Sequence, residues 1–243
     1  MQTVKTRGLV VRKSDYGESN SMLTILTDEL GVVSACAYGV RSKKSKIRSA
    51  VQPLCCTGFV LSKKGGEIYR VDSAEIIESF YPICEDVEKL ALANYLCEAG
   101  REAYADGDVR ILKLILNTLY VLAYKDIPVR VAKAVFELKL MQLSGYSPEM
   151  HSCIVCGEKE NLTAFDFSGG AVCEKCRTTA MLNITSEVLQ ACRYILSAED
   201  KKIFSFTIHE NGEKNIADLA EGYFMHKSER HYRSLEYYKK ILY

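Results

Sequence analysis

Residues 21–40 read SMLTILTDELGVVSACAYGV, two short runs of apolar or alternating residues that meet at Gly31. Runs of this length that end at glycines are typical of β-strands joined by tight turns. The pattern extends to both sides, through TRGLVVRKSDY (residues 6–16) and CCTGFVLSKKGGEIYRVDSAEII (residues 55–77), where KKGGE predicts a hairpin. About five such strands predict a small closed or partly open barrel, such as an OB-fold, over residues 1–80.

The spacing of apolar residues changes to a helical period after Pro82. Asp108 is the predicted N-cap of a second helix, and Pro128 lies near the start of a third, where its missing N–H costs little. Either Thr185 or Ser186 can cap a later helix. The helical segments are EDVEKLALANYLCEAGREAYAD (85–106), VRILKLILNTLYVLAYK (109–125), VRVAKAVFELKLMQLSGY (129–146), TSEVLQACRYILS (185–197) and the amphipathic EGYFMHKSERHYRSLEYYKKIL (221–242). The expected fold class is therefore α+β, with a helical domain over residues 81–243.

The composition is that of a globular protein with a sizeable core, because 48% of the 243 residues are hydrophobic and 26% are charged. No run reaches the roughly 18 apolar residues of a membrane-spanning helix. Lys5 and Arg7 precede only the short apolar run GLVV, which is unlike a secretory signal peptide. We therefore expect a cytoplasmic protein without membrane contact. The net charge of +1 says little about partners, since it averages over unlike segments.

Four of the ten cysteines form two CxxC pairs in CIVCGEKENLTAFDFSGGAVCEKC, residues 153–176. Two such turns brought together make a closed tetrahedral site for zinc. The sixteen-residue spacer is long enough for a β-hairpin, and Gly169 and Gly170 supply backbone freedom for its turn. The sequence thus predicts one structural zinc ion within residues 150–178, held by Cys153, Cys156, Cys173 and Cys176. Redox thiols, a disulfide pair or bound iron are the alternatives.

Catalytic chemistry has little support in the sequence. A catalytic zinc normally keeps one position open for water, and four sulfurs leave none. The chain has four histidines and no HExxH, GxSxG, GxGxxG or P-loop pattern. We therefore expect no catalytic residues and no enzymatic activity.

A basic segment lies between two predicted strands, in YGVRSKKSKIRSAVQPL (residues 38–54). Its charges repel one another, which predicts a mobile, hydrated loop until a polyanion binds. Loops and the adjacent sheet face of OB-folds often bind single-stranded nucleic acid, although a solvated surface loop is the simpler interpretation. The basic residues are Arg41, Lys43, Lys44, Lys46 and Arg48. Nearby aromatic residues are expected to pack in the core or at its rim and are not assigned to a site; they are Tyr16, Tyr38, Phe59 and Tyr69.

Across its whole length the chain resembles the bacterial RecO family of DNA repair proteins. The resemblance rests on stretches that occur in the family's order: SDYGESNSMLTILTDELGVVSACAYGVRSKKSK, LCCTGFVLSKKGGEIYRV, FELKLMQLSGYSPEMHSCIVCG, FSGGAVCEKC and HYRSLEYYKKIL. It implies an OB domain, a helical domain and a zinc-binding segment, and its zinc positions match Cys153, Cys156, Cys173 and Cys176. The resemblance also implies that the five basic residues of the loop contact DNA as a group.

The resemblance also implies a function. Such proteins are non-enzymatic recombination mediators that bind single- and double-stranded DNA, anneal complementary strands, and work with RecR to help RecA displace single-strand binding protein (SSB). A cytoplasmic, nucleoid-associated location follows.

The resemblance further implies that an acidic SSB tail docks on the helical domain. Such a tail needs an apolar groove with a basic rim, for which Arg130 and Lys133 are candidates. Basic residues near the C-terminus are expected to extend the DNA track; they are Lys227, Arg230, Arg233, Lys239 and Lys240. A zinc-ribbon interaction module in transcription or translation remains the alternative, and a thiol or metal enzyme is a third interpretation.

Overall fold

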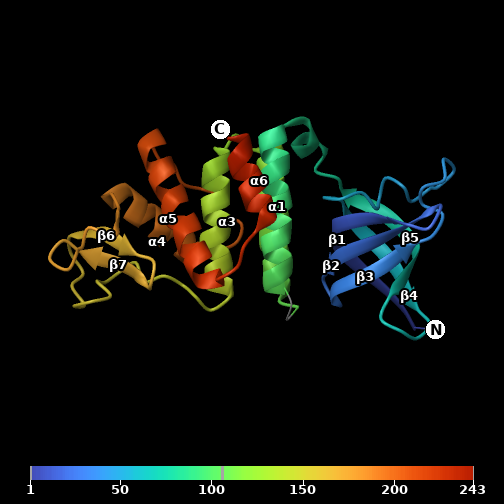
Figure 1. Cartoon of the computed structure of the whole chain (residues 1–243), viewed down its shortest axis with the longest axis horizontal. Coiled ribbons are helices and arrows are strands. Elements are labelled where there is room, and N and C mark those ends of the chain that lie inside the picture. Colours follow the sequence, from blue (N-terminus) through green and yellow to red (C-terminus); the bar gives the residue numbers. More distant parts are fainter. Residues whose placement is uncertain (1, 105–106, 243) are drawn as a thin grey trace. The chain divides into compact units, whose positions relative to one another are not determined.

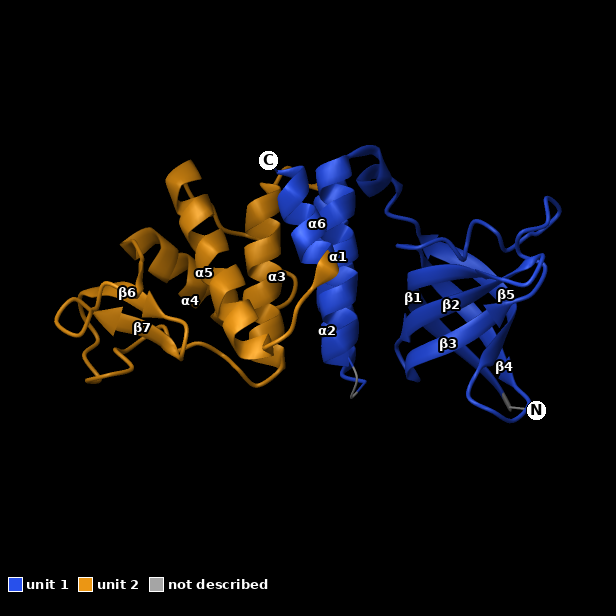
Figure 2. Cartoon of the chain, viewed as in Figure 1, with its two compact units in different colours: residues 1–124, 234–243 blue, residues 125–233 orange. Residues whose placement is uncertain are grey.

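The computed structural model describes residues 2–104 and 107–242. The chain divides into two compact units, one formed by Met1–Tyr124 with Ser234–Tyr243 and the other by Lys125–Arg233 (Figure 2). Each unit has its own set of buried side chains.

The first unit begins with a closed five-stranded barrel, which confirms the predicted architecture (Figure 1). The strands run in the order β1-β2-β3-β5-β4, with β3 and β5 parallel and the other pairs antiparallel. A bulge between Val10 and Arg12 bends β1, so that one half pairs with β2 and the other with β4. The strands are β1 (Gln2–Tyr16), β2 (Asn20–Thr27), β3 (Gly31–Ala37), β4 (Cys56–Lys63) and β5 (Tyr69–Glu78).

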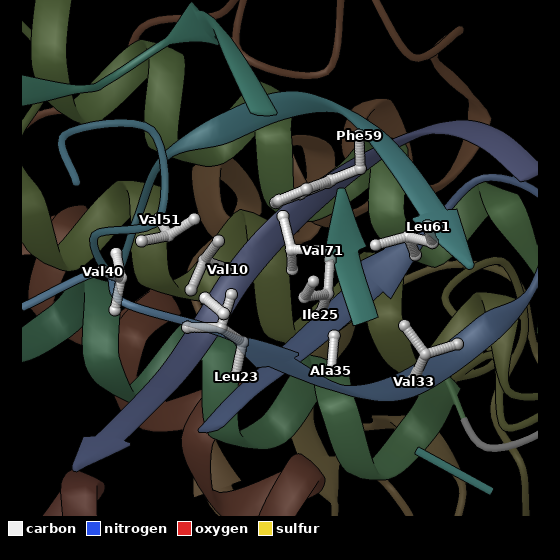
Figure 3. Close-up of a cluster of buried hydrophobic side chains, with 11 residues drawn as sticks. Val10, Leu23, Ile25, Val33, Ala35, Val40, Val51, Phe59, Leu61 and Val71 are labelled. Carbon is white, nitrogen blue, oxygen red and sulfur yellow. The ribbon is translucent and has the colours of Figure 1, made fainter. Parts of the chain in front are cut away.

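Alternate side chains of these strands fill the barrel, as period-two patterning requires (Figure 3). Val10, Leu23 and Phe59 are among the residues buried there. Gly8 allows β1 and β2 to approach closely, because a Cβ at this position would lie 2.5 Å from the Cγ2 atom of Ile25. The barrel is thus a packed core whose binding surfaces must lie on its outside.

Helices complete the first unit: the 3-10 helix η1 (Tyr81–Glu85), α1 (Val87–Ala103), α2 (Val109–Tyr124) and α6 (Arg233–Ile241). The Asp108 carboxylate accepts a hydrogen bond from the backbone N–H of Arg110, which confirms the predicted cap of α2. The buried Tyr104 hydroxyl donates to the Thr27 carbonyl at 2.7 Å and fixes the end of α1 to the barrel. This bond joins α1 to the barrel within the first unit.

The second unit packs α3 (Val129–Leu143) against α5 (Glu210–Ser228), with α4 (Ser186–Ser197) beside them. A small sheet joins this layer: β6 (Leu162–Asp166), β7 (Gly170–Cys173) and β8 (Leu182–Asn183), in the order β7-β6-β8. Thr185 caps α4 by accepting from the Val188 N–H, which resolves the choice between Thr185 and Ser186. In the part of the chain that the structure describes, no helix has the length and apolar character needed to cross a membrane.

Candidate metal centre and nucleic-acid interface

The four predicted zinc ligands come together in the second unit. Cys153, Cys156, Cys173 and Cys176 place their sulfur atoms within 4.8 Å of one another. Zinc binds thiolates at about 2.3 Å, which sets tetrahedral sulfurs about 3.8 Å apart. The Sγ atoms of Cys156 and Cys173 are 3.7 Å apart, which matches one edge of such a tetrahedron.

Local backbone turns build each half of this cluster. The Cys153 carbonyl accepts from the Gly157 N–H at 2.8 Å, and Gly157 adopts a positive φ of 79° that closes the first turn. The Cys173 carbonyl accepts from the Cys176 N–H at 3.0 Å and closes the second. The β6–β7 hairpin fills the predicted spacer and carries the second turn to the first.

Gly170 of the β6–β7 hairpin lets the backbone at Glu149, just before the first cysteine turn, approach the hairpin closely. Glu149 bridges Gly170, donating to the Gly169 carbonyl at 3.0 Å and accepting from the Ala171 N–H at 2.7 Å. A Cβ at Gly170 would collide with the Glu149 backbone. The glycine pair therefore serves close backbone approach in addition to the expected turn.

The cysteine thiols perturb one another. Burial raises the pKa of Cys153, but backbone N–H groups of Cys173, Cys156 and Val155 donate to its sulfur and bring the pKa down to about 6. Hydrogen bonding to the sulfurs of Cys156 and Cys173 raises the pKa of Cys176 to about 12. Four adjacent thiolates repel, so a bound cation is what allows all four to ionise together. The cluster can hold a metal ion, and four thiolates suit zinc or iron.

The basic loop joins β3 to β4 in the first unit, and all five of its basic side chains are exposed. Its backbone is more ordered than expected, because it forms successive turns such as the bond from the Ser45 N–H to the Ser42 carbonyl at 3.1 Å. Val40 and Val51 are buried in the barrel core (Figure 3). Ile47 packs against this core. The basic loop, which the sequence predicted to be mobile, is therefore a folded segment. Its apolar side chains pack on the barrel core, and its basic side chains are exposed to solvent.

The five charges differ in their local partners. Arg41 forms an ion pair with Asp15 at 3.4 Å and donates to the Gly17 carbonyl. Across residues 2–104 and 107–242, the ammonium groups of Lys43, Lys44 and Lys46 make no hydrogen bond or ion pair. These three lysines are therefore available to phosphate groups.

Three tyrosines beside this loop line a groove of about 750 Å³, which we call the tyrosine groove. Tyr16 and Tyr38 are each 55% exposed there, while Tyr69 is half-buried. Phe59 is buried in the barrel, as expected for a core residue. The sequence pattern alone does not show which aromatic residues are exposed in the groove and which are buried, because the three tyrosines and Phe59 all lie in or next to strands.

The two candidate rim residues of the helical domain have different environments. Arg130 is exposed, with its side chain 4.0 Å from Glu213. Lys133 is only 2% exposed, and its ammonium contacts Glu137 and Glu221, each at 2.8 Å. The expectation that Lys133 lies on a groove rim is therefore corrected: α5 covers this face of α3, and the charge is compensated internally.

The C-terminal basic residues are divided between the two units. Lys227 belongs to the second unit, where its ammonium donates to the Ser168 carbonyl at 2.6 Å. Lys239 and Lys240 belong to the first unit, on α6. Glu229, with a φ of 50°, interrupts the segment between α5 and α6. A shared DNA track along this segment stays a prediction.

Known proteins resemble the chain over its full length. The family model Recombination protein O N terminal matches residues 1–80, and Recombination protein O C terminal matches residues 84–236. DNA repair protein RecO of Acetivibrio thermocellus is 32% identical over 252 residues, covering 99% of this chain and 98% of that protein. The protein of the same name from Alkaliphilus metalliredigens is 33% identical over 246 residues, covering 98% and 99%. The match of both family models and of these relatives shows that the chain belongs to the RecO family.

Proposed function

We propose that this RecO-family protein is a recombination mediator that binds single- and double-stranded DNA, anneals complementary strands and, with RecR, assists RecA in displacing SSB. The observation that carries the proposal is the exposed basic loop of the barrel, which Ile47 anchors and whose three lysines have no partner among the residues that the structure describes. The relatives are named DNA repair proteins, which supports the same process. The cytoplasm, at the nucleoid, is the corresponding location.

Annealing requires charge neutralisation and no covalent catalysis. Two single strands repel through their phosphates, and cations that bind phosphates release counterions and lower this barrier. Contacts to phosphate leave base edges free to pair. A loop that presents Lys43, Lys44 and Lys46 to solvent suits this task, so the proposed mediator acts without catalytic residues.

The metal has a structural role in this proposal. The Cys153, Cys156, Cys173 and Cys176 sulfurs would hold one zinc ion and leave no ligand position for substrate. The ion would tie the β6–β7 hairpin to the preceding chain and thereby stabilise the second unit. DNA contact is assigned to the barrel and not to the metal.

The SSB tail is proposed to bind the second unit near Arg130. An acidic peptide that ends in apolar residues needs a basic rim, and the Arg130 guanidinium is 52% exposed at the N-terminal end of α3. Lys133 is left out of this proposed rim, because its ammonium already contacts Glu137 and Glu221.

Assays on SSB-coated DNA test the proposed function. The protein should accelerate annealing of complementary SSB-coated oligonucleotides and, with RecR, shorten the lag before RecA assembles on SSB-coated single strands. Omitting RecR should remove the second effect and keep the first. Absence of DNA binding at low salt would contradict the proposal and would favour a protein-interaction role for the metal segment.

A further inference from the structure

We propose that the tyrosine groove holds unstacked bases of a single strand, with Tyr16 and Tyr38 as stacking platforms. This inference rests on the proposed DNA binding and adds a second contact type to it. The basic loop would contact phosphates, and the groove would contact bases. The barrel therefore has a site specific for single-stranded DNA beside a site that tolerates any DNA.

The groove lies between two turns at one end of the barrel. Tyr16 ends β1 at the β1–β2 turn, and Lys64, Gly65 and Ile68 belong to the β4–β5 turn on the other side. Met22 and Cys36, which pair across β2 and β3, line it between the turns. These strands and turns are the ones through which five-stranded barrels of this kind bind oligonucleotides. Its volume of about 750 Å³ lies within the range of pockets that bury small ligands.

Its aromatic rings are accessible. Tyr16 and Tyr38 are each 55% exposed, whereas Tyr95 and Tyr104 of the same unit are fully buried. Base–aromatic stacking tolerates any sequence, because every base has a π-face. Two exposed rings in one groove therefore suit a strand whose bases are unpaired.

Cations accompany these rings. The Arg70 guanidinium lies 5.5 Å from the centroid of the Tyr38 ring, and the Lys63 ammonium lies 4.9 Å from that of Tyr69. Asp72, the acid of the groove, is paired with Arg70 at 3.3 Å. The groove thus combines π-faces with positive charge, as sites for single strands do.

The groove is continuous with the basic loop. Tyr38 is the first residue of the loop, and the Gly39 N–H donates to the Asn20 Oδ1 atom at 2.9 Å. The Arg41 N–H donates to the Ser19 carbonyl at 2.9 Å, and its guanidinium reaches the Gly17 carbonyl at 3.4 Å. These bonds pin the start of the loop to the β1–β2 turn that bears Tyr16. A strand whose phosphates follow the loop therefore brings its bases to the groove.

Binding to three DNA probes of equal length tests the inference: an oligothymidylate, an abasic single strand and a duplex. Tyr16→Ala and Tyr38→Ala should each weaken oligothymidylate binding at least about fivefold. Binding of the abasic strand and of the duplex should be unchanged, because both depend on phosphate contacts. Tyr16→Phe and Tyr38→Phe should behave like the native protein, since the ring remains. Tyr237→Ala, which removes a 59% exposed tyrosine on α6, is the matched control.

A fluorescence measurement gives an independent readout. The chain contains no tryptophan, so Tyr38→Trp places a single tryptophan in the groove, whose emission can be excited apart from that of the tyrosines. Oligothymidylate should quench its emission at saturation, and the abasic strand should not; a Tyr237→Trp protein should respond to neither. Equal loss of all three probes in the alanine variants, or no loss of any, would overturn the inference while leaving DNA binding intact. A native protein that binds none of the probes would overturn the proposed function as well. If Tyr38→Ala instead weakens binding of RecR and leaves oligothymidylate affinity unchanged, the groove is a protein-binding site and the inference is wrong.

Discussion

The Sγ atoms of Cys156 and Cys173 lie 3.7 Å apart across a separation of 17 residues. This distance is far longer than a disulfide bond of about 2.05 Å and matches the edge of a tetrahedron around one metal ion. The β6–β7 hairpin creates it, because this hairpin carries Cys173 back to the first cysteine turn. The geometry therefore favours the predicted metal site over a disulfide in this pair.

Replacing a metal ligand is expected to destabilise the second unit. Zinc bound to such peptides contributes roughly 10–16 kcal/mol of apparent binding free energy, so Cys153→Ser should lower the free energy of unfolding by at least about 3 kcal/mol. The native chain should contain one zinc ion by elemental analysis, and the variant should contain less than one. Cys84→Ser, at an exposed cysteine outside the cluster, is the control. A zinc-free variant with native stability and selectively lost DNA binding would contradict the structural role.

The two adjacent glycines of the hairpin should differ sharply in their tolerance of alanine. A Cβ at Gly170 would collide with the Glu149 backbone, whereas a Cβ at Gly169 would lie 3.5 Å from the Cδ1 atom of Ile154. We expect Gly170→Ala to cost about 1–3 kcal/mol and to weaken zinc retention, with Gly169→Ala close to native. Thermal unfolding and competition with a zinc chelator measure the two effects. Equal behaviour of the two variants would show that the Glu149 bridge does not support the metal segment.

The buried lysine of α3 is expected to matter for stability. Lys133→Met removes an ammonium that lies 2.8 Å from both Glu137 and Glu221, a change that typically costs about 3–5 kcal/mol at buried pairs. Arg130→Ala removes an exposed charge and should cost no more than about 1 kcal/mol. Urea unfolding measures the free energy of unfolding of both variants.

Arg130 is also expected to contribute to peptide binding. If Arg130 forms the proposed rim, Arg130→Glu should weaken binding of an SSB tail peptide. Unchanged peptide affinity would remove Arg130 from that site.

The basic loop should set the salt dependence of DNA affinity. Each phosphate contact with single-stranded DNA contributes about −0.7 to the slope of log affinity against log salt, so reversing Lys43, Lys44 and Lys46 to Glu should flatten the slope by about two. Reversal of three exposed lysines in the second unit provides a control with the same change in net charge: Lys201, Lys202 and Lys214. Equal slopes for the two variants would exclude the loop from phosphate binding.

Features encoded locally were predictable from the sequence. Glycine-punctuated strands and the two CxxC turns each depend on neighbouring residues, so the barrel and the metal cluster were both expected. The environment of Lys133 depends on Glu221, 88 residues away, and helical periodicity alone does not separate a buried lysine from one at a rim. Ile47 likewise anchors the basic loop through contacts that exist only once the barrel has closed. Strand patterning does not distinguish Tyr38 from Phe59, because the groove forms where separate turns meet.

The most direct measurement of the proposed function is the initial rate at which complementary SSB-coated oligonucleotides anneal. The native protein should accelerate annealing, and the variant with Lys43, Lys44 and Lys46 changed to Glu should be at least about tenfold slower at equal concentration. The control with Lys201, Lys202 and Lys214 changed to Glu should anneal at the native rate. Annealing by the loop variant at the native rate would contradict the assignment of DNA contact to the basic loop of the barrel.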